Sequence, residues 1–219
     1  MVDREQLISD LVNDLKAKPR QLPILVVALL WWLISWVYVV VATLLLGPLR
    51  ASAHHELLHE HQFQIESLIG LMAGLLITLV AWYGSVPGAL TRKAMISGIF
   101  LGLVWLGFYI VGLFEPALEP SMHGKREHCY LEAFIYSVPP TAIACWLIAK
   151  RYPLKRLQTG LMTGLAAGMM PALFMQFACM YDPQHILTHH ILPGIANAVV
   201  GVALLSAFIF FSKSHRTSP

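Results

Sequence analysis

Six long apolar runs, separated by short polar segments, dominate the pattern of the chain. They cover residues 24–47, 65–83, 95–114, 131–149, 159–178 and 190–211. About 20 consecutive apolar residues are needed to cross about 30 Å of hydrocarbon as a helix. The runs are continuous rather than alternating, which argues against the strands of a transmembrane barrel. The pattern therefore predicts an all-α membrane protein, with a six-transmembrane-helix bundle over residues 23–212.

The composition agrees with this prediction, because 57% of the 219 residues are hydrophobic and only 12% are charged. The mean hydropathy of +0.65 is too high for an ordinary soluble domain of this size. Twelve of the 15 lysines and arginines fall in the termini and in the loops on one side of the predicted bundle; the exceptions are Arg50, Lys125 and Arg126. Cytoplasmic loops retain positive residues, so we predict that both termini are cytoplasmic.

Residues 3–17 form the only sizeable polar segment outside the bundle and its loops, and they show a helical apolar stripe. The stripe consists of Leu7, Ile8, Leu11, Val12 and Leu15. A helix of about four turns is marginal on its own, so this one requires a surface to pack on. A partner protein, the membrane interface and the rest of the chain are all candidates. The aspartates Asp3, Asp10 and Asp14 in the segment favour a protein partner over the lipid surface.

Nine of the ten histidines lie in or beside the three loops on the outer side of the predicted bundle. Histidine is also a common polar residue for short loops, so one interpretation is structural. The other is a metal-binding or proton-sensing face, because imidazole titrates near neutral pH and is the commonest metal ligand.

The first outer loop contains the pattern H-E-x-x-H at His55, Glu56 and His59. On a helix this pattern places two imidazoles on one face with a glutamate beside them, as in zinc proteases. The surrounding tract is so rich in histidine that the match carries little weight, and the loop offers no substrate cleft. An intramembrane metalloprotease therefore remains a minor alternative, and auxiliary metal binding by His55 and His59 stays open.

Two cysteines reach the outer surface from helices that are far apart in the sequence. Cys129 begins the fourth run and Cys179 ends the fifth, and His185 and His189 follow Cys179. Two thiolates and two imidazoles suit a tetrahedral site for zinc, cadmium or copper(I). We therefore predict that Cys129, Cys179, His185 and His189 bind a metal, with Asp182 and His190 as auxiliary ligands. A structural disulfide between the two cysteines is the alternative.

The sequence contains no P-loop, dinucleotide-binding fingerprint or nucleophile elbow, and the inner loops are too short for a catalytic domain. We therefore expect neither an enzyme nor an organic cofactor. A metal transporter or permease is the main alternative function, but it would place ligands near the middle of the membrane rather than at one surface. The sequence leaves open whether the chain is a monomer or a homodimer.

Several segments, taken in order and spacing, carry a family likeness. They are Leu7–Leu15, Ser85-Val-Pro-Gly88, Cys129, Ser137-Val-Pro139, and Asp182-Pro-Gln-His185 followed by His189. In this combination the chain resembles the NrsF-type membrane anti-sigma factors, which are negative regulators of an extracytoplasmic-function sigma factor in Gram-negative bacteria. The histidine tract 54–61 and Cys145 are not part of that pattern.

The resemblance implies a multi-pass protein of the bacterial inner (cytoplasmic) membrane. Residues 1–22 would hold the sigma factor, residues 213–219 would form a short cytoplasmic tail, and no direct contact with nucleic acid is expected. Cys129 and Cys179 would respond to heavy metals from the periplasmic side. Our hypothesis is that metal binding at the outer surface weakens the grip of the N-terminal segment on the sigma factor.

Overall fold

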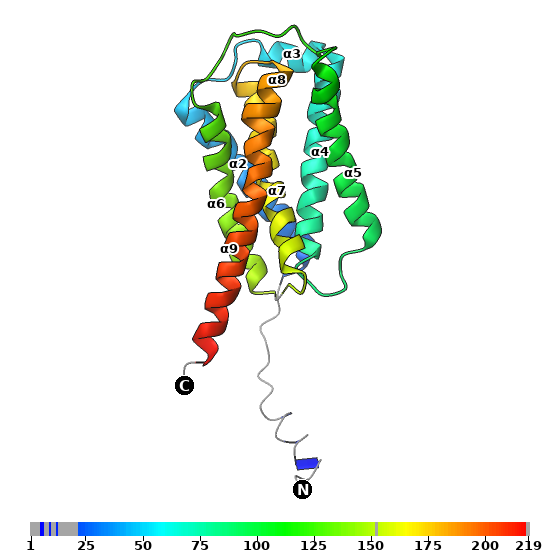
Figure 1. Cartoon of the computed structure of the whole chain (residues 1–219), viewed down its shortest axis with the longest axis vertical. Coiled ribbons are helices and arrows are strands. Elements are labelled where there is room, and N and C mark those ends of the chain that lie inside the picture. Colours follow the sequence, from blue (N-terminus) through cyan, green and yellow to red (C-terminus); the bar gives the residue numbers. More distant parts are fainter. Residues whose placement is uncertain (1–4, 7–8, 10–11, 13–21, 152, 218–219) are drawn as a thin grey trace.

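The computed structural model describes residues 5, 6, 9, 12, 22–151 and 153–217, which form an upright helical bundle (Figure 1). The described residues contain helices and loops but no strand. The helices are α2 (Ile24–Leu46), α3 (Ala53–His59), α4 (His61–Tyr83), α5 (Arg92–Gly112), α6 (Cys129–Ala149), α7 (Arg156–Ala178), α8 (Pro183–His185), the π-helix η1 (Ile186–Ile191) and α9 (Leu192–Thr217).

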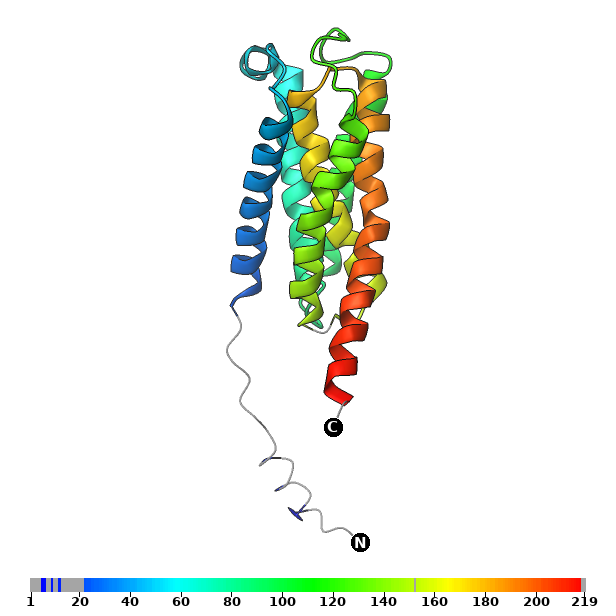
Figure 2. The same cartoon turned by 90° about the vertical axis from the view of Figure 1, so that its left-hand side faces the viewer.

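Six of these helical stretches are long and apolar enough to cross a membrane, which confirms the predicted all-α, six-helix fold. The start of α2 and the end of α9 lie at the same end of the bundle, opposite α3 and α8 (Figures 1 and 2). We name the end with α3 and α8 the outer end and the opposite end the inner end, following the predicted orientation.

At the outer end, the residues at which helices begin differ from the prediction. The sixth span begins at Pro183 rather than at residue 190, because α8, η1 and α9 form one continuous stretch. The Asp182 carboxylate caps its start by accepting a hydrogen bond from the His185 amide at 3.1 Å. Much of the histidine tract 54–61, predicted as a loop, is the short helix α3. Hydropathy shows the lipid-crossing part of a helix but not its polar ends.

The tightest packing in the bundle joins α7 to α9. A side chain added at Gly164, Gly168 or Gly201 would collide with the facing backbone, so only glycine permits this approach. Asn197 of α9 donates to the Gly164 carbonyl at 2.9 Å and to the Thr141 hydroxyl of α6 at 2.7 Å. These contacts join α6, α7 and α9 into one unit.

Helix α2 lies at the edge of the bundle, and only 22% of its membrane-spanning window is buried (Figure 2). In the inner half of α2, the Trp31 indole donates a hydrogen bond to the Pro140 carbonyl of α6 at 3.1 Å and packs against Trp82 of α4. This lightly packed helix directly follows residues 1–22, so it is the element through which the bundle connects to the N-terminal segment.

Candidate metal centre

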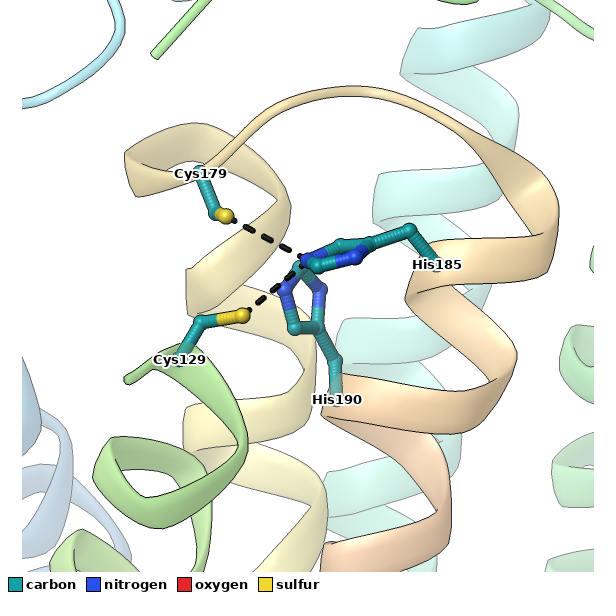
Figure 3. A group of neighbouring side chains, drawn as sticks. All are labelled: Cys129, Cys179, His185 and His190. Atoms are coloured by element: carbon teal, nitrogen blue, oxygen red, sulfur yellow. Dashed lines mark hydrogen bonds between the residues drawn. The ribbon is translucent and has the colours of Figure 1, made fainter. Parts of the chain in front are cut away.

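Four side chains from three segments converge at the outer end of the bundle (Figure 3). Cys129 is the first residue of α6, Cys179 directly follows α7, His185 ends α8 and His190 lies in η1. All four are buried, and each offers a ligand atom within 4.8 Å of the others. We call this group the Cys2His2 centre.

The centre contains His190, which the sequence analysis had named only as an auxiliary ligand, and it does not contain His189, the ligand predicted there. In an α-helix with 3.6 residues per turn, positions 185 and 190 would lie about 140° apart around the axis. The π-helix η1 changes this register, because its wider turn pairs residues five apart. His190 therefore joins His185 on the buried face, while the exposed His189 stacks on the outside of the His185 ring with 4.3 Å between ring centres.

The distances within the centre fit a metal ion bound by four ligands. The His185 Nε2 atom lies 3.0 Å from the Cys129 sulfur and 3.5 Å from the Cys179 sulfur. In a tetrahedral zinc site, with Zn–S bonds of about 2.3 Å and Zn–N bonds of about 2.0–2.1 Å, neighbouring ligand atoms lie about 3.5–3.8 Å apart. Both cysteines are free thiols rather than a disulfide. Small movements of side chains would complete such a site.

His190 provides an independent reason to place a ligand here. Its side chain is fully buried, and neither ring nitrogen forms a hydrogen bond of normal geometry among the described residues, although the Cys179 thiol is close enough to interact with the ring. A buried polar group without a partner typically costs about 1–3 kcal/mol. Coordination of a metal by one nitrogen would remove part of this cost, so the residues present fit a bound ion.

The Cys179 thiol is prepared for ligation by its neighbours. Its pKa is lowered from the usual value, chiefly because the Cys129 thiol donates a hydrogen bond to it. The His185 imidazole and the Arg126 amide, which lies 3.5 Å from the sulfur, act in the same direction against the opposing effect of burial. Because the thiolate is the form that binds metals, this environment favours a soft metal ion.

Arg126 links the centre to the ends of two helices, which sequence reasoning missed. Its guanidinium forms an ion pair with Glu132 of α6 at 2.7 Å. It also donates to backbone carbonyls at and just beyond the ends of α2 and α7, where the last carbonyls of a helix have no partner within it. These acceptors are Thr43, Gly47 and Pro48 around the end of α2, at 2.7–3.1 Å, and Ala178 at the end of α7, at 3.2 Å.

An open cleft of about 790 Å³ borders Arg126 at the outer end. Its charged and imidazole lining is mixed, with glutamates and histidines beside three cations: Glu56, Glu119, Glu127, Glu132, His123, His128, Arg50, Lys125 and Arg126. The cleft is therefore a polar opening on the side of the molecule on which the Cys2His2 centre lies.

The H-E-x-x-H residues lie apart from the centre, on α3. The rings of His55 and His59 stack with centres 4.2 Å apart, as expected for positions four apart on a helix. Glu56, however, forms an ion pair with the buried Arg50 at 2.5 Å, so it is occupied as a structural partner. The group of ligands found among the described residues includes neither histidine. This arrangement does not favour protease chemistry.

A buried polar network lies beside the centre and ties α7 to α4 and α5. The Glu66 carboxylate of α4 accepts a hydrogen bond from the Tyr181 hydroxyl at 2.9 Å. Gln176 of α7 donates to the Ser67 hydroxyl at 3.0 Å and accepts a hydrogen bond from Tyr109. Because these groups satisfy one another, they form a rigid link between α7, α4 and α5.

A comparison with protein families decides what kind of protein carries this centre. The model of the NrsF family, described as negative regulator of sigma F, matches residues 11–210. The chain belongs to the NrsF family. The match includes all four residues of the Cys2His2 centre and most of the bundle. No curated protein and no solved structure matches the chain. Membership makes this NrsF protein a negative regulator of a sigma factor.

Most of the partner-binding residues expected in this NrsF protein fall outside the described part of the chain. They are Leu7, Ile8, Leu11 and Leu15. Val12 is described and is helical, with 59% of its surface exposed. The role of residues 1–22 therefore stays a prediction.

Proposed function

We propose that this protein is a metal-responsive anti-sigma factor of the bacterial inner membrane. It holds an extracytoplasmic-function sigma factor through residues 1–22 and releases it when a zinc-, cadmium- or copper(I)-like ion binds Cys129, Cys179, His185 and His190. The observation that carries this proposal is the buried convergence of two thiols and two imidazoles, one of which forms no hydrogen bond of normal geometry.

The connection between the metal and the N-terminal segment runs through Arg126 and α2. Ligation draws the Cys129 and Cys179 sulfurs toward one ion, and this movement shifts the loop that carries Arg126, whose amide contacts Cys179. The guanidinium then loses its alignment with the carbonyls at the end of α2. Because α2 has few other buried contacts, its change of position reaches residues 1–22.

The placement of the ligands favours a sensor over a transporter. The Cys2His2 centre is formed at the outer ends of α6 and α7, and the seam between α7 and α9 is closed by direct contact of their backbones. A transporter would need ligands near the middle of the membrane and a path along the helices.

The choice between His189 and His190 provides the first test. We expect the purified protein to bind one Zn²⁺ or Cd²⁺ per chain, measured by elemental analysis and titration. Cys179→Ser and His190→Ala remove ligands, so affinity should fall by more than the roughly 10- to 100-fold that loss of a group supporting a ligand costs. His189→Ala removes only a stacked neighbour and should retain the metal.

Cys145→Ser is the matched control, because Cys145 is a buried thiol of the same helix as Cys129 but contacts the Gly201 carbonyl instead. It should bind metal like the unaltered protein. Loss of metal in His189→Ala with retention in His190→Ala would contradict the assigned ligand set.

The second test concerns the partner. Deletion of residues 1–22 should abolish capture of the sigma factor, because these residues carry the apolar stripe that requires a partner surface. The truncated protein should still insert into membranes and bind metal, since all four ligands remain. Pull-down of the cognate sigma factor from membranes measures the first property. Undiminished capture by the truncated protein would place the interaction elsewhere.

A further inference from the structure

Two adjoining cavities lie at the inner end of the bundle, far from the Cys2His2 centre. The first is a cleft of about 400 Å³ between the loop that joins α4 to α5 and the start of α7. The second is an apolar groove of about 220 Å³ along α4 and α5. Leu90 and Thr91 line both, so the two cavities meet at these residues.

The shape of the cleft is set by the Ser85-Val-Pro-Gly88 segment. The Ala89 amide donates to the Val86 carbonyl at 3.2 Å, and Gly88 has a φ of 75°. Proline followed by a residue of positive φ defines a type II turn, which explains the Pro-Gly pair. The Thr159 hydroxyl of α7 donates to the Gly84 carbonyl at 3.2 Å and holds this turn against the start of α7.

The lining of the cleft is suited to an anion. Arg92, the first residue of α5, and Lys155, the N-cap residue of α7, contribute exposed positive side chains, and no carboxylate lines the cleft among the described residues. Both helices begin at the cleft, so the positive ends of their dipoles add to the same potential. Thr91 and Gln158 add polar side chains.

In contrast to the charged cleft, the groove is apolar. It is lined almost entirely by apolar side chains, with Tyr83 and Thr91 at the inner end. The other lining residues are Leu76, Leu79, Val80, Ala89, Leu90 and Ala94. Because α4 and α5 are membrane-spanning helices, the groove runs into the hydrocarbon while the cleft lies at the polar surface.

We propose that the cleft and the groove together bind one anionic phospholipid. Its phosphate lies in the cleft against Arg92 and Lys155, and one acyl chain lies in the groove. A soluble phosphate would use the cleft alone, and a neutral lipid would use the groove alone. Only an anionic phospholipid matches both parts and their junction at the membrane surface. Such a lipid would brace the inner loops against the start of α7, and its binding does not depend on metal sensing.

The test uses the full-length protein in mixed micelles, with bound lipid detected by native mass spectrometry. We expect one tightly held phosphatidylglycerol and little phosphatidylcholine. Arg92→Gln with Lys155→Gln should lower the affinity for phosphatidylglycerol by roughly 10- to 30-fold, since each cation near a charged surface contributes about a factor of five.

Lys93→Gln with Arg156→Gln is the matched control. These residues are the immediate neighbours of Arg92 and Lys155, are also exposed and have the same charge, but line neither cavity. This variant should retain the lipid. Equal losses in both double variants would show a general effect of surface charge and would overturn the proposed site.

Ala94→Phe tests the groove without changing any charge, because Ala94 is exposed and lines only the apolar cavity. It should displace the lipid. Retention of the lipid by Ala94→Phe, or competition by glycerol 3-phosphate at the same concentration as the lipid, would overturn the role of the acyl chain. Unchanged Zn²⁺ binding by each variant shows that the bundle is intact.

Discussion

Cells with Cys179→Ser in place of the natural protein are expected to keep the sigma factor at the membrane when they are exposed to zinc or cadmium. Serine is nearly the same size as cysteine but is a poor ligand for soft metals. Driving a regulator from 99% held to 99% released requires about 5.5 kcal/mol of differential binding. We expect most of this free energy to come from the two thiolates. The measurement is transcription from a sigma-dependent reporter with and without metal.

Cys129→Ser should give the same silent phenotype, and Cys145→Ser should respond normally because its thiol lies in the α6–α9 contact rather than in the centre. Normal induction by metal in Cys179→Ser or Cys129→Ser would contradict a mechanism in which the thiols bind the metal.

A further substitution separates ligation from thiol oxidation. Cys129→His provides a metal ligand but cannot form a disulfide with Cys179, which lies across the centre. If the signal is ligation, this variant should respond to zinc at a shifted concentration. If the signal is oxidation, it should be as silent as Cys129→Ser.

The six helices could be predicted from the sequence because lipid permits few solutions. A continuous apolar run must satisfy its backbone internally, so hydropathy alone places five of the six spans to within four residues, whereas the sixth begins seven residues earlier than predicted. The pairing of Cys129 with Cys179 also followed from topology, because Cys129 begins α6 and Cys179 follows the end of the antiparallel α7, so both lie at the outer end of the bundle. A contact between residues far apart in the sequence could be predicted where the topology placed both residues at the same side of the membrane.

The register of the histidines could not be predicted in the same way. Positions 185 and 189 share a face in an α-helix, and nothing in the local residues signals the wider turn of η1. The buried face therefore receives His190, one residue further along the chain. A single inserted residue in a helix changes which ligand faces the core.

Arg126 was overlooked for a different reason, although the sequence contained a signal. Arg50 and Arg126 are two of the three cations on the outer side, and each is followed six residues later by a glutamate, Glu56 and Glu132. The structure pairs them, at 2.5 Å and 2.7 Å. Exceptions to a charge asymmetry are therefore candidates for buried pairs that join helix ends.

Arg126→Gln is expected to release the sigma factor without metal. Glutamine is too short to reach Glu132 and the carbonyls at the ends of α2 and α7 together. Hydrogen bonds that involve a charged group contribute about 1.5–3 kcal/mol each, so the loss of several is comparable to the switching free energy. Reporter activity without metal should rise at least about tenfold, which corresponds to about 1.4 kcal/mol.

Arg50→Gln distinguishes this effect from general damage to the bundle. It also breaks a buried ion pair at the outer end, with Glu56, and a contact with the Gln176 carbonyl of α7. Among the described residues, its guanidinium bonds to Glu56 and the Gln176 carbonyl and makes none of the contacts to α2 that Arg126 makes, so it should leave the sigma factor held. Both variants should still bind Zn²⁺ through Cys129, Cys179, His185 and His190. Equal release by Arg50→Gln, or full repression by Arg126→Gln, would mean that the signal leaves the centre by a route other than α2.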